Sequence, residues 1–397
     1  MRNFVTIMDN KAFSAALFKW AHRHWRELPW RGCGDPYAIW LSEIILQQTR
    51  ISQGTKYWLR FMHTYPTVAD LAAASEDEVL KLWQGLGYYS RARNLHAAAR
   101  QIVERGAFPD TYQEIRRLKG VGDYTAAAIA SMAFGLPHAA VDGNVYRILA
   151  RIFAISTPID STQGKHEFQQ LADALCPTDK AGYWNQAMMD FGALQCKPKG
   201  PGCGSCPFAD MCEARRLGQT ASFPVKEGRV KQRDRYFTYY YITRAHEVLF
   251  HRRGTDDIWR SLWEPVLVEG DAASLDDAGR VVKHVLTHQT IYAQLIRIDA
   301  TRLTDHEPLP YGLPPIAQLL KEYSWATPDE REGYAATADG QTARRQVALA
   351  ARRLCRHADG GRGCSPGRWQ KGKSHVNCRL CWLILIFSLS LQRFIIH

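Results

Sequence analysis

The chain has 397 residues, which is too long for one compact core and predicts two or three domains. Its composition, 46% hydrophobic and 23% charged with 12 Trp, excludes a disordered polymer and a coiled coil. The N-terminus lacks the residue order of a secretory signal, and ten cysteines are too sparse for a disulfide scaffold, so we expect a cytoplasmic protein with reduced thiols.

The formal net charge of +12 is unevenly distributed along the chain. Residues 326–397 carry 12 Lys and Arg against 5 Asp and Glu, which accounts for +7 of that total. The overall charge is therefore weak evidence for nucleic-acid binding, and sequence motifs must provide that evidence instead.

Residues 1–195 have the pattern of a string of helices. Asp35-Pro36 predicts a helix start, with Asp as the N-cap and Pro at the first helical position, and apolar residues follow over 38–49. Ser75 and Glu78 have the spacing of a capping box, which predicts another helix directly after them.

Further along, the sequence predicts two helices joined by a tight hairpin. Thr111 and Glu114 form a capping box that opens the first of them. Gly120 and Gly122 then interrupt the pattern, and an alanine-rich helix is expected over 124–134.

The second half of the chain changes to strand-forming residues after a basic stretch, 215–235, which we interpret as a linker. β-branched and aromatic residues over 237–243, 248–250 and 263–268 predict three strands. We therefore expect a second domain of α+β class over 236–325.

The last segment, 326–397, is rich in Ala, Arg and Gly and is predicted to belong to neither domain. Its apolar run over 382–387 is far shorter than the roughly 20 residues that a membrane span requires. We expect no membrane association, and an extension produced by a shifted reading frame is one hypothesis for this segment.

Four of the ten cysteines lie in a C-x6-C-x2-C-x5-C pattern over 196–212, namely Cys196, Cys203, Cys206 and Cys212. Four thiolates this close together can hold one metal centre, either zinc or a [4Fe–4S] cluster. Structural zinc sites usually pair two C-x2-C units, whereas here there is only one such pair. The spacing therefore favours a [4Fe–4S] cluster over zinc, and unligated cysteines are a less favoured alternative.

Gly120, Val121 and Gly122 form a turn whose neighbouring N–H groups can bind a DNA phosphate. One G-x-G is weak evidence, but Asp142-Gly143-Asn144 follows 20 residues later, and the four cysteines come after it. This ordered set resembles the helix-hairpin-helix DNA glycosylase superfamily with its iron–sulfur loop. The resemblance covers about residues 10–215 and implies a mainly α domain over 1–214.

Three longer motifs are similar to those of one branch of that superfamily. They are R-E-L-P-W-R at 26–31, W-L-S-E-I-I-L-Q-Q-T at 40–49 and G-L-G-Y-Y-S-R-A-R-N-L at 85–95. Together they resemble the adenine glycosylases of the MutY family. The resemblance implies a monomeric enzyme of base excision repair that removes adenine mispaired with 8-oxoguanine or guanine in double-stranded DNA.

Two carboxyl groups fit the chemistry of breaking a bond between adenine and deoxyribose. Glu43 lies among apolar residues, and burial keeps a carboxyl protonated so that it can donate a proton to the base. Asp142 precedes a predicted helix start near Asn144, where free N–H groups favour the ionised form. The resemblance implies that Glu43 protonates adenine and then activates water, while Asp142 stabilises the cationic sugar, with a transient covalent bond as one form of that stabilisation. A surface glutamate and a simple helix cap are the alternatives.

Tyr124 occupies the position at which related bifunctional glycosylases carry a lysine that attacks the sugar. A tyrosine cannot form a Schiff base, so we predict a monofunctional glycosylase that leaves an abasic site. A packing role beside the hairpin is the alternative for this residue.

The resemblance also assigns residues that hold the extruded base and the opened duplex. Candidates to fill the gap in the base stack are Gln48, Leu86 and Tyr88. Candidates for the adenine pocket are Arg26, Leu28, Trp30, Arg31 and Ile51, with core packing as the alternative for the apolar ones. Asn144 is expected to contact the sugar or water, and Asp190 is expected to support Glu43.

The segment 236–325 resembles the Nudix-like domain by which the same family senses 8-oxoguanine, including D-I-W-R-S-L-W-E at 257–264. The glutamate-rich metal box of Nudix hydrolases is missing, so nucleotide hydrolysis is not expected. Leu286, Thr287 and His288 occupy the position of the lesion-reading loop, which is Phe-Ser-His in many relatives. Loss of the phenyl ring predicts fewer contacts to the lesion.

Two other functions remain open at this point. One is a glycosylase with lyase activity on oxidised pyrimidines, which Tyr124 and the second domain disfavour. The other is a DNA-binding protein without catalytic activity that uses the cluster as a redox sensor.

Overall fold

A computed structural model of the chain describes residues 10–228, 232–275, 281–286, 288–334 and 336. The chain divides into two compact units, one up to residue 230 and the other from residue 231, which are considered separately. Within the described ranges, none of the helices combines the length and the apolar content that crossing a membrane requires.

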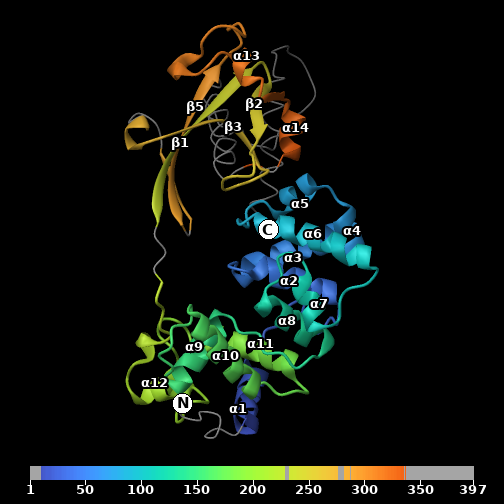
Figure 1. The fold of residues 1–397 in the computed structure, drawn as a ribbon, viewed down its shortest axis with the longest axis vertical. Helices are drawn as coiled ribbons and strands as arrows, with labels where there is room; N and C mark the ends of the chain where they lie inside the picture. Colours follow the sequence, from blue (N-terminus) through green and yellow to red (C-terminus); the bar gives the residue numbers. More distant parts are fainter. Residues whose placement is uncertain (1–9, 229–231, 276–280, 287, 335, 337–397) are drawn as a thin grey trace, which may run out of the picture. The chain divides into compact units, whose positions relative to one another are not determined.

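The first unit is helical (Figure 1). Its elements are α1 (Asn10–His24), α2 (Pro36–Leu46), α3 (Ile51–Thr64), α4 (Val68–Ala73), α5 (Glu76–Trp83), α6 (Ser90–Arg105), α7 (Tyr112–Arg117), α8 (Asp123–Phe134), α9 (Gly143–Phe153), α10 (Thr162–Leu175), α11 (Ala181–Leu194) and α12 (Glu213–Arg216), with short 3-10 turns at Cys203–Ser205 and Thr220–Ser222.

The predicted helix starts are confirmed by their capping bonds. The Asp35 carboxylate accepts from the Tyr37 N–H at the start of α2, and Ser75 makes both bonds of its capping box with Glu78. The alanine-rich helix is α8. Helix α2 ends at Leu46, earlier than the expected 49, because Gln48 takes a left-handed conformation with φ 56°.

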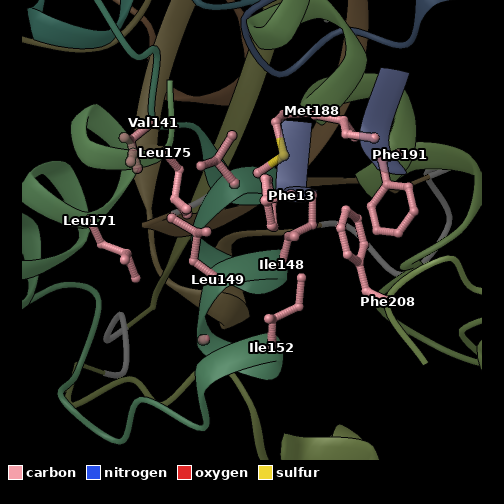
Figure 2. Packing of buried hydrophobic residues seen from close by; sticks show 14 of the residues in the cluster. Phe13, Val141, Ile148, Leu149, Ile152, Leu171, Leu175, Met188, Phe191 and Phe208 are labelled. Carbon is pink, nitrogen blue, oxygen red and sulfur yellow. The ribbon is translucent and has the colours of Figure 1, made fainter. Parts of the chain in front are cut away.

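The core of this unit surrounds α9 (Figure 2). Ile148 and Ile152 of α9 lie in one cluster with Phe13 of α1 and Phe191 of α11. The ring of Phe208 stacks on that of Phe13 with centroids 4.6 Å apart. Full burial of each such side chain stabilises the fold by about 1.5–3 kcal/mol. Because Phe208 lies within the cysteine segment, this core fixes that segment and α9 together.

The second unit is a six-stranded sheet with short helices, which fits the expected α+β class. Its strands are β1 (Arg233–Arg244), β2 (Glu247–Arg252), β3 (Trp263–Gly270), β4 (Val282–Val285), β5 (Gln289–Asp299) and β6 (Ser324–Ala326), in the order β4-β5-β1-β3-β2-β6. The other elements are 3-10 turns at Ala272–Ser274 and Pro310–Gly312 and the helices α13 (Ile316–Leu319) and α14 (Pro328–Gly333). Strands β1 and β5 run parallel over their whole length, and the other neighbours are antiparallel (Figure 1). The three predicted strands correspond to β1, β2 and β3.

A network of alternating charges holds the segment between β2 and β3 against the sheet. The guanidinium of Arg235 pairs with Asp257 at 2.7 Å and with Glu269 at 2.6 Å. Arg253 pairs with Asp257 at 2.9 Å and with Glu264 at 2.6 Å. Each of these carboxylates therefore has a guanidinium partner.

The expected linker, 215–235, is shorter in the structure. The Asp160 carboxylate accepts hydrogen bonds from the backbone N–H groups of Glu227 and Gly228 at 3.0 and 2.9 Å, and β1 begins at Arg233. A basic, polar composition does not prevent a segment from docking through its own backbone.

The second unit also extends beyond its expected last residue. Ala326 pairs with Val248 across β6 and β2, and Arg331 of α14 donates to the hydroxyl of Tyr241 at 2.5 Å. The beginning of the predicted tail therefore packs on the sheet, because its Thr-Pro sequence starts a capped helix. Residues 337–397, including the apolar run at 382–387, lie outside the described residues.

Candidate active site

Glu43 lies in the most deeply buried helix segment of the first unit and is only 8% exposed. The hydroxyl of Tyr124, from α8, donates a hydrogen bond to Glu43 Oε2 at 2.9 Å. Burial raises the pKa of Glu43 to about 7, and nearby Asp142 adds to the rise, while the bond from Tyr124 and the charge of Arg31 oppose it. A carboxyl with this pKa can both give and take a proton near neutral pH.

Asp142 is the N-cap of α9. Its Oδ1 accepts from the N–H groups of Asn144 and Val145 at 2.8 and 2.9 Å, and Oδ2 accepts from the Asn144 side-chain amide at 2.6 Å. Burial nevertheless raises the pKa of Asp142 above its ordinary value, against the lowering effect of these bonds and of Arg147. The bonds at the helix start therefore favour the ionised form, but removal from water outweighs them and gives a net rise of the pKa.

Arg147 fixes the orientation of the Asn144 amide. Its guanidinium donates to Asn144 Oδ1 and to the carbonyl of Gly192, both at 2.8 Å, and to the carbonyl of Cys196 at 2.9 Å. A Cβ at Gly192 would lie 2.5 Å from Asn144 Cβ, so only glycine allows this close approach. Asn144 thus donates directly to Asp142, and the Arg147 guanidinium holds the side-chain oxygen of Asn144 in place.

Asp190 pairs with two arginines of the candidate adenine pocket. It is 1% exposed and accepts hydrogen bonds from Arg26 and from both terminal nitrogens of Arg31, the latter at 2.8 and 2.9 Å. Among the described residues, no hydrogen bond joins Asp190 to Glu43. Asp190 thus pairs with two arginines, of which Arg31 also contributes its charge at Glu43.

The other candidates for the adenine pocket differ in their burial. The Leu28 carbonyl accepts from the Arg31 N–H at 2.9 Å, and Trp30 is buried with its ring centroid 5.7 Å from that of Trp58. Ile51 is half-buried at the first turn of α3. Leu28 and Ile51 thus keep part of their surface accessible, whereas Trp30 is mainly a packing residue in this structure.

The three candidates for filling the base stack have different surroundings. Gln48 and Tyr88 are exposed and have positive φ values of 56° and 47°. Leu86 is buried, so in this structure it packs inside the domain instead of facing solvent. Gln48 and Tyr88 are therefore the two of these candidates whose side chains are exposed to solvent.

The hairpin between α7 and α8 contains a left-handed turn at Gly120. Gly120 has φ +77°, and a Cβ there would lie 2.6 Å from Asn94 Cβ, so the turn depends on glycine. Val121 is buried and anchors the turn, while Gly120 and Gly122 are exposed. The Val121 N–H donates to the Leu118 carbonyl at 3.1 Å and the Val121 carbonyl accepts from Arg116 at 3.2 Å, so the exposed part of the turn is that of the two glycines.

The four cysteines line one cavity, together with Arg151 and Phe208. Burial raises the pKa of Cys206 to about 11, and it raises the pKa of Cys212, with the neighbouring thiols contributing to both shifts. The Arg151 guanidinium donates to Cys196 Sγ at 3.4 Å and to the carbonyl of Lys197 at 2.7 Å. Four sulfur donors around one cavity, beside a cation, are a donor set that fits an anionic iron–sulfur cluster. In the described part of the chain, no three His, Cys, Asp or Glu side chains are arranged to hold a single metal ion.

In the sheet unit, the candidate lesion-reading residues lie between β4 and β5. Leu286 packs against the cluster that contains Phe237 and Ile291, and its N–H donates to the Gln289 carbonyl at 2.8 Å. His288 is exposed. Thr287 lies outside the described residues.

Two arginines in the helical unit, the buried Arg147 and the half-buried Arg91, were not predicted as functional residues from the sequence. Arg147 stands three residues after Asn144, and Arg91 lies in the third motif, where a charged residue on a helix is usually solvated. No local signal marks them, since Asn144 and Arg151 lie on the same helix face as Arg147 and Asn94 lies on that of Arg91.

Comparison with known proteins defines the class first. Residues 41–176 match the model of the "HhH-GPD superfamily base excision DNA repair protein". A solved structure of a thermostable thymine-DNA glycosylase is 30% identical, with a TM-score of 0.49, over 52% of this chain and 97% of that chain.

Curated relatives narrow the assignment. The adenine DNA glycosylase of Mus musculus is 40% identical over 57% of this chain and 46% of its own length. That of Buchnera aphidicola subsp. Acyrthosiphon pisum is 32% identical over 64% of this chain and 74% of its own length. The chain belongs to the adenine DNA glycosylase family. It spans less than half the length of the mouse, human and rat relatives.

Proposed function

We propose that the protein is a DNA glycosylase that removes adenine mispaired with 8-oxoguanine or guanine in double-stranded DNA. Membership of the adenine DNA glycosylase family supports the target base. The observation that carries the proposal is Glu43, a buried carboxyl that is hydrogen-bonded to Tyr124 and lies close enough to Asp142 for the two charges to interact.

Adenine leaves deoxyribose only when it is protonated, because the neutral base holds the bonding electron pair poorly. Tyr124 donates to Glu43 Oε2, so that oxygen acts as an acceptor and the acidic proton belongs on Oε1. Glu43 gives this proton to a ring nitrogen of the extruded base. The C1′–N9 bond then breaks with its electron pair passing to adenine.

The remaining sugar carries positive charge, which Asp142 stabilises as an anion. The Asn144 amide and two backbone N–H groups hold the Asp142 carboxylate in a fixed direction. Glu43, now ionised, removes a proton from water, whose oxygen bonds to C1′. The products are free adenine and an abasic site, and Glu43 is protonated again.

The reaction would end at the abasic site, because attack on the sugar by the protein requires an amine. Tyr124 stands where a lysine nucleophile would be required, and its pKa is raised well above the ordinary value by burial. Tyr124 therefore orients Glu43 and does not cut the strand.

The four cysteines would hold a [4Fe–4S] cluster. Bound there, the cluster would supply a rigid covalent anchor for the loop between Cys196 and Cys203. Purified protein should show brown absorbance near 400 nm, about the range of iron–sulfur thiolate bands. Cys203→Ser should lose it, and a colourless protein that contains zinc would contradict this assignment.

We propose that the sheet unit is a Nudix-like domain that contacts 8-oxoguanine opposite the adenine through Leu286, Thr287 and His288. Asp257, Glu264 and Glu269 of this unit favour a structural role over nucleotide hydrolysis, because the guanidinium groups of Arg235 and Arg253 neutralise them. The enzyme would act as a cytoplasmic monomer.

An end-labelled duplex with one adenine·8-oxoguanine pair tests the function. Cleavage at the adenine only after alkali treatment is the expected result. Cutting without alkali at an oxidised pyrimidine would instead indicate the lyase alternative. Binding without any cutting would indicate the non-catalytic alternative.

A further inference from the structure

Two exposed residues of the helical unit adopt backbone conformations that L-residues avoid. Gln48 follows the end of α2, and Tyr88 precedes α6, and both lie in the left-handed region. Such conformations persist only where neighbouring groups enforce them. The two residues are 40 positions apart in sequence. A side chain that restrains both must therefore contact two separate segments of the chain.

Arg91, in the first turn of α6, contacts both segments with one guanidinium group. Its Nη1 donates to three carbonyls at the end of α2 and its Nη2 donates to two carbonyls of the turn before α6. The acceptors are Ile44 at 3.0 Å, Ile45 at 3.1 Å, Gln47 at 2.6 Å, and Leu86 and Gly87 both at 3.2 Å.

Two aromatic rings lie near the Arg91 guanidinium, and two hydrogen bonds from α3 also hold the turn before α6. The Arg91 guanidinium lies 5.0 Å from the ring centroid of Trp83 and 5.8 Å from that of Tyr88. From α3, the Tyr57 hydroxyl donates to the Gln84 carbonyl at 2.6 Å and the Gln53 amide donates to the Gly85 carbonyl at 3.3 Å. The segments 46–50 and 84–89 are therefore held by a common set of contacts, with Arg91 as the member that bonds to both.

We propose that Arg91 is a positioning residue that locks the two segments in register, so that Gln48 and Tyr88 enter a DNA duplex together. This inference rests on the proposed function, in which these two side chains occupy the space left by the extruded base. Arg91 touches neither the base nor Glu43, but it bonds to the helix turn that follows Glu43.

The chemistry of this position requires arginine and not lysine. Five carbonyl oxygens converge on one group, and a planar guanidinium has donors in several fixed directions, whereas an ammonium is a single point. The positive charge also lies at the carbonyl end of α2, where a helix favours cations. Arg91→Lys keeps the charge and most of the alkyl stem, so it removes mainly the shared hydrogen bonds.

The first test measures amide hydrogen exchange of the full-length protein without DNA. In Arg91→Lys, segments 46–50 and 84–89 should both exchange at least about tenfold faster, because one group restrains both. Arg100→Lys is the matched control, since Arg100 lies on the same helix and donates to the Ala72 carbonyl at 3.4 Å, away from both segments. Wild-type exchange in either segment of Arg91→Lys would overturn the proposal.

The second test uses 2-aminopurine in place of adenine opposite 8-oxoguanine, with its fluorescence as the signal for base extrusion. Arg91→Lys should lose most of the signal and should excise adenine about 10–100-fold more slowly in single turnovers. The pH profile of its excision rate should keep its wild-type midpoint, because Arg91 does not contact Glu43. A displaced midpoint, or a wild-type fluorescence signal, would contradict a positioning role.

The two tests separate this inference from the proposed function. If the wild-type protein excises no adenine, the proposed function fails, while the exchange experiment still decides whether Arg91 restrains both segments. If Arg91→Lys has a lowered unfolding midpoint, Arg91→Met with the same exchange measurement replaces it, and unchanged exchange there would also reject the proposal.

Discussion

Each unit of the protein buries a glutamate. One of them accepts hydrogen bonds from a neutral group and the other from a cation. Glu43 of the helical unit is 8% exposed and accepts a hydrogen bond from a neutral phenol. Glu264 of the sheet unit is 2% exposed and accepts two bonds from the Arg253 guanidinium at 2.6 and 2.7 Å, with His251 Nε2 at 3.2 Å. Burial alone therefore does not make a carboxyl available for proton transfer, because a carboxylate that is paired with a buried guanidinium has a structural role.

The pKa values of Asp257 and Glu269 in the sheet unit differ from that of Glu43 for the same reason. Burial without a directly bonded cation raises the pKa of Glu43 to about 7. Hydrogen bonds from Arg235 lower the pKa of Asp257 and of Glu269. Acid should therefore stabilise the first site and destabilise the second, and this difference can be tested.

Replacing Glu43 should have the largest effect. Glu43→Gln keeps the shape of the side chain but cannot supply a proton, so excision of adenine should fall by about 10²–10⁴-fold. Binding to the mispaired duplex should remain near the wild-type value. Single-turnover kinetics and a binding titration measure the two quantities. Glu104→Gln, on the exposed face of α6, is the control, and a Glu43→Gln variant with more than a tenth of wild-type activity would contradict the acid role.

Replacing Arg253 tests the other side of the comparison. Arg253→Met leaves Glu264 buried without its guanidinium partner and should lower the free energy of unfolding by about 3–5 kcal/mol. The double variant Arg253→Met/Glu264→Gln should recover a large part of this loss, since no charge is left unpaired. Urea denaturation measures both. If the double variant is no more stable than the single one, the loss comes from packing and not from the charge.

The stability of the helical unit should depend on pH through Glu43. Its pKa is about 7 in the folded protein and near the ordinary 4.5 when unfolded, so between these values only the folded state binds the proton. Stability should therefore fall as the pH rises from 4.5 to 7, by about 1.4 kcal/mol per pH unit within that window. The difference in unfolding free energy between wild type and Glu43→Gln isolates this effect. A difference that is constant with pH would show that the pKa of Glu43 is not raised.

The sequence predicted the elements that depend on local signals. Capping residues located the starts of α2 and α5, and β-branched and aromatic runs located β1 to β3. The apolar neighbours of Glu43 correctly predicted its burial. These features are local because a cap or an alternating pattern is complete within a few residues.

The sequence could not predict contacts between distant segments. The partners of Asp190 are the arginines at 26 and 31, about 160 positions earlier, and nothing near Asp190 indicates them. The pKa of Asp142 was expected to follow its cap, but burial by other helices determines the direction. The shared bonds of Arg91 likewise join segments that only the tertiary fold brings together.

Removing the phenol of Tyr124 should have the smallest effect and the most specific one. The hydrogen bond from Tyr124 favours ionised Glu43, so Tyr124→Phe should raise the pKa of Glu43 further. The decline of excision above neutral pH should then begin at a higher pH, by about one unit for a bond to a charged group, while the rate at pH 6 changes less than about tenfold. Tyr112→Phe removes a comparable phenol that bonds to exposed Asp123 at 3.4 Å and should leave the profile unchanged. A midpoint that moves to lower pH in Tyr124→Phe would mean that the phenol holds the acid in its protonated form, which would reverse the role of Tyr124 in the site.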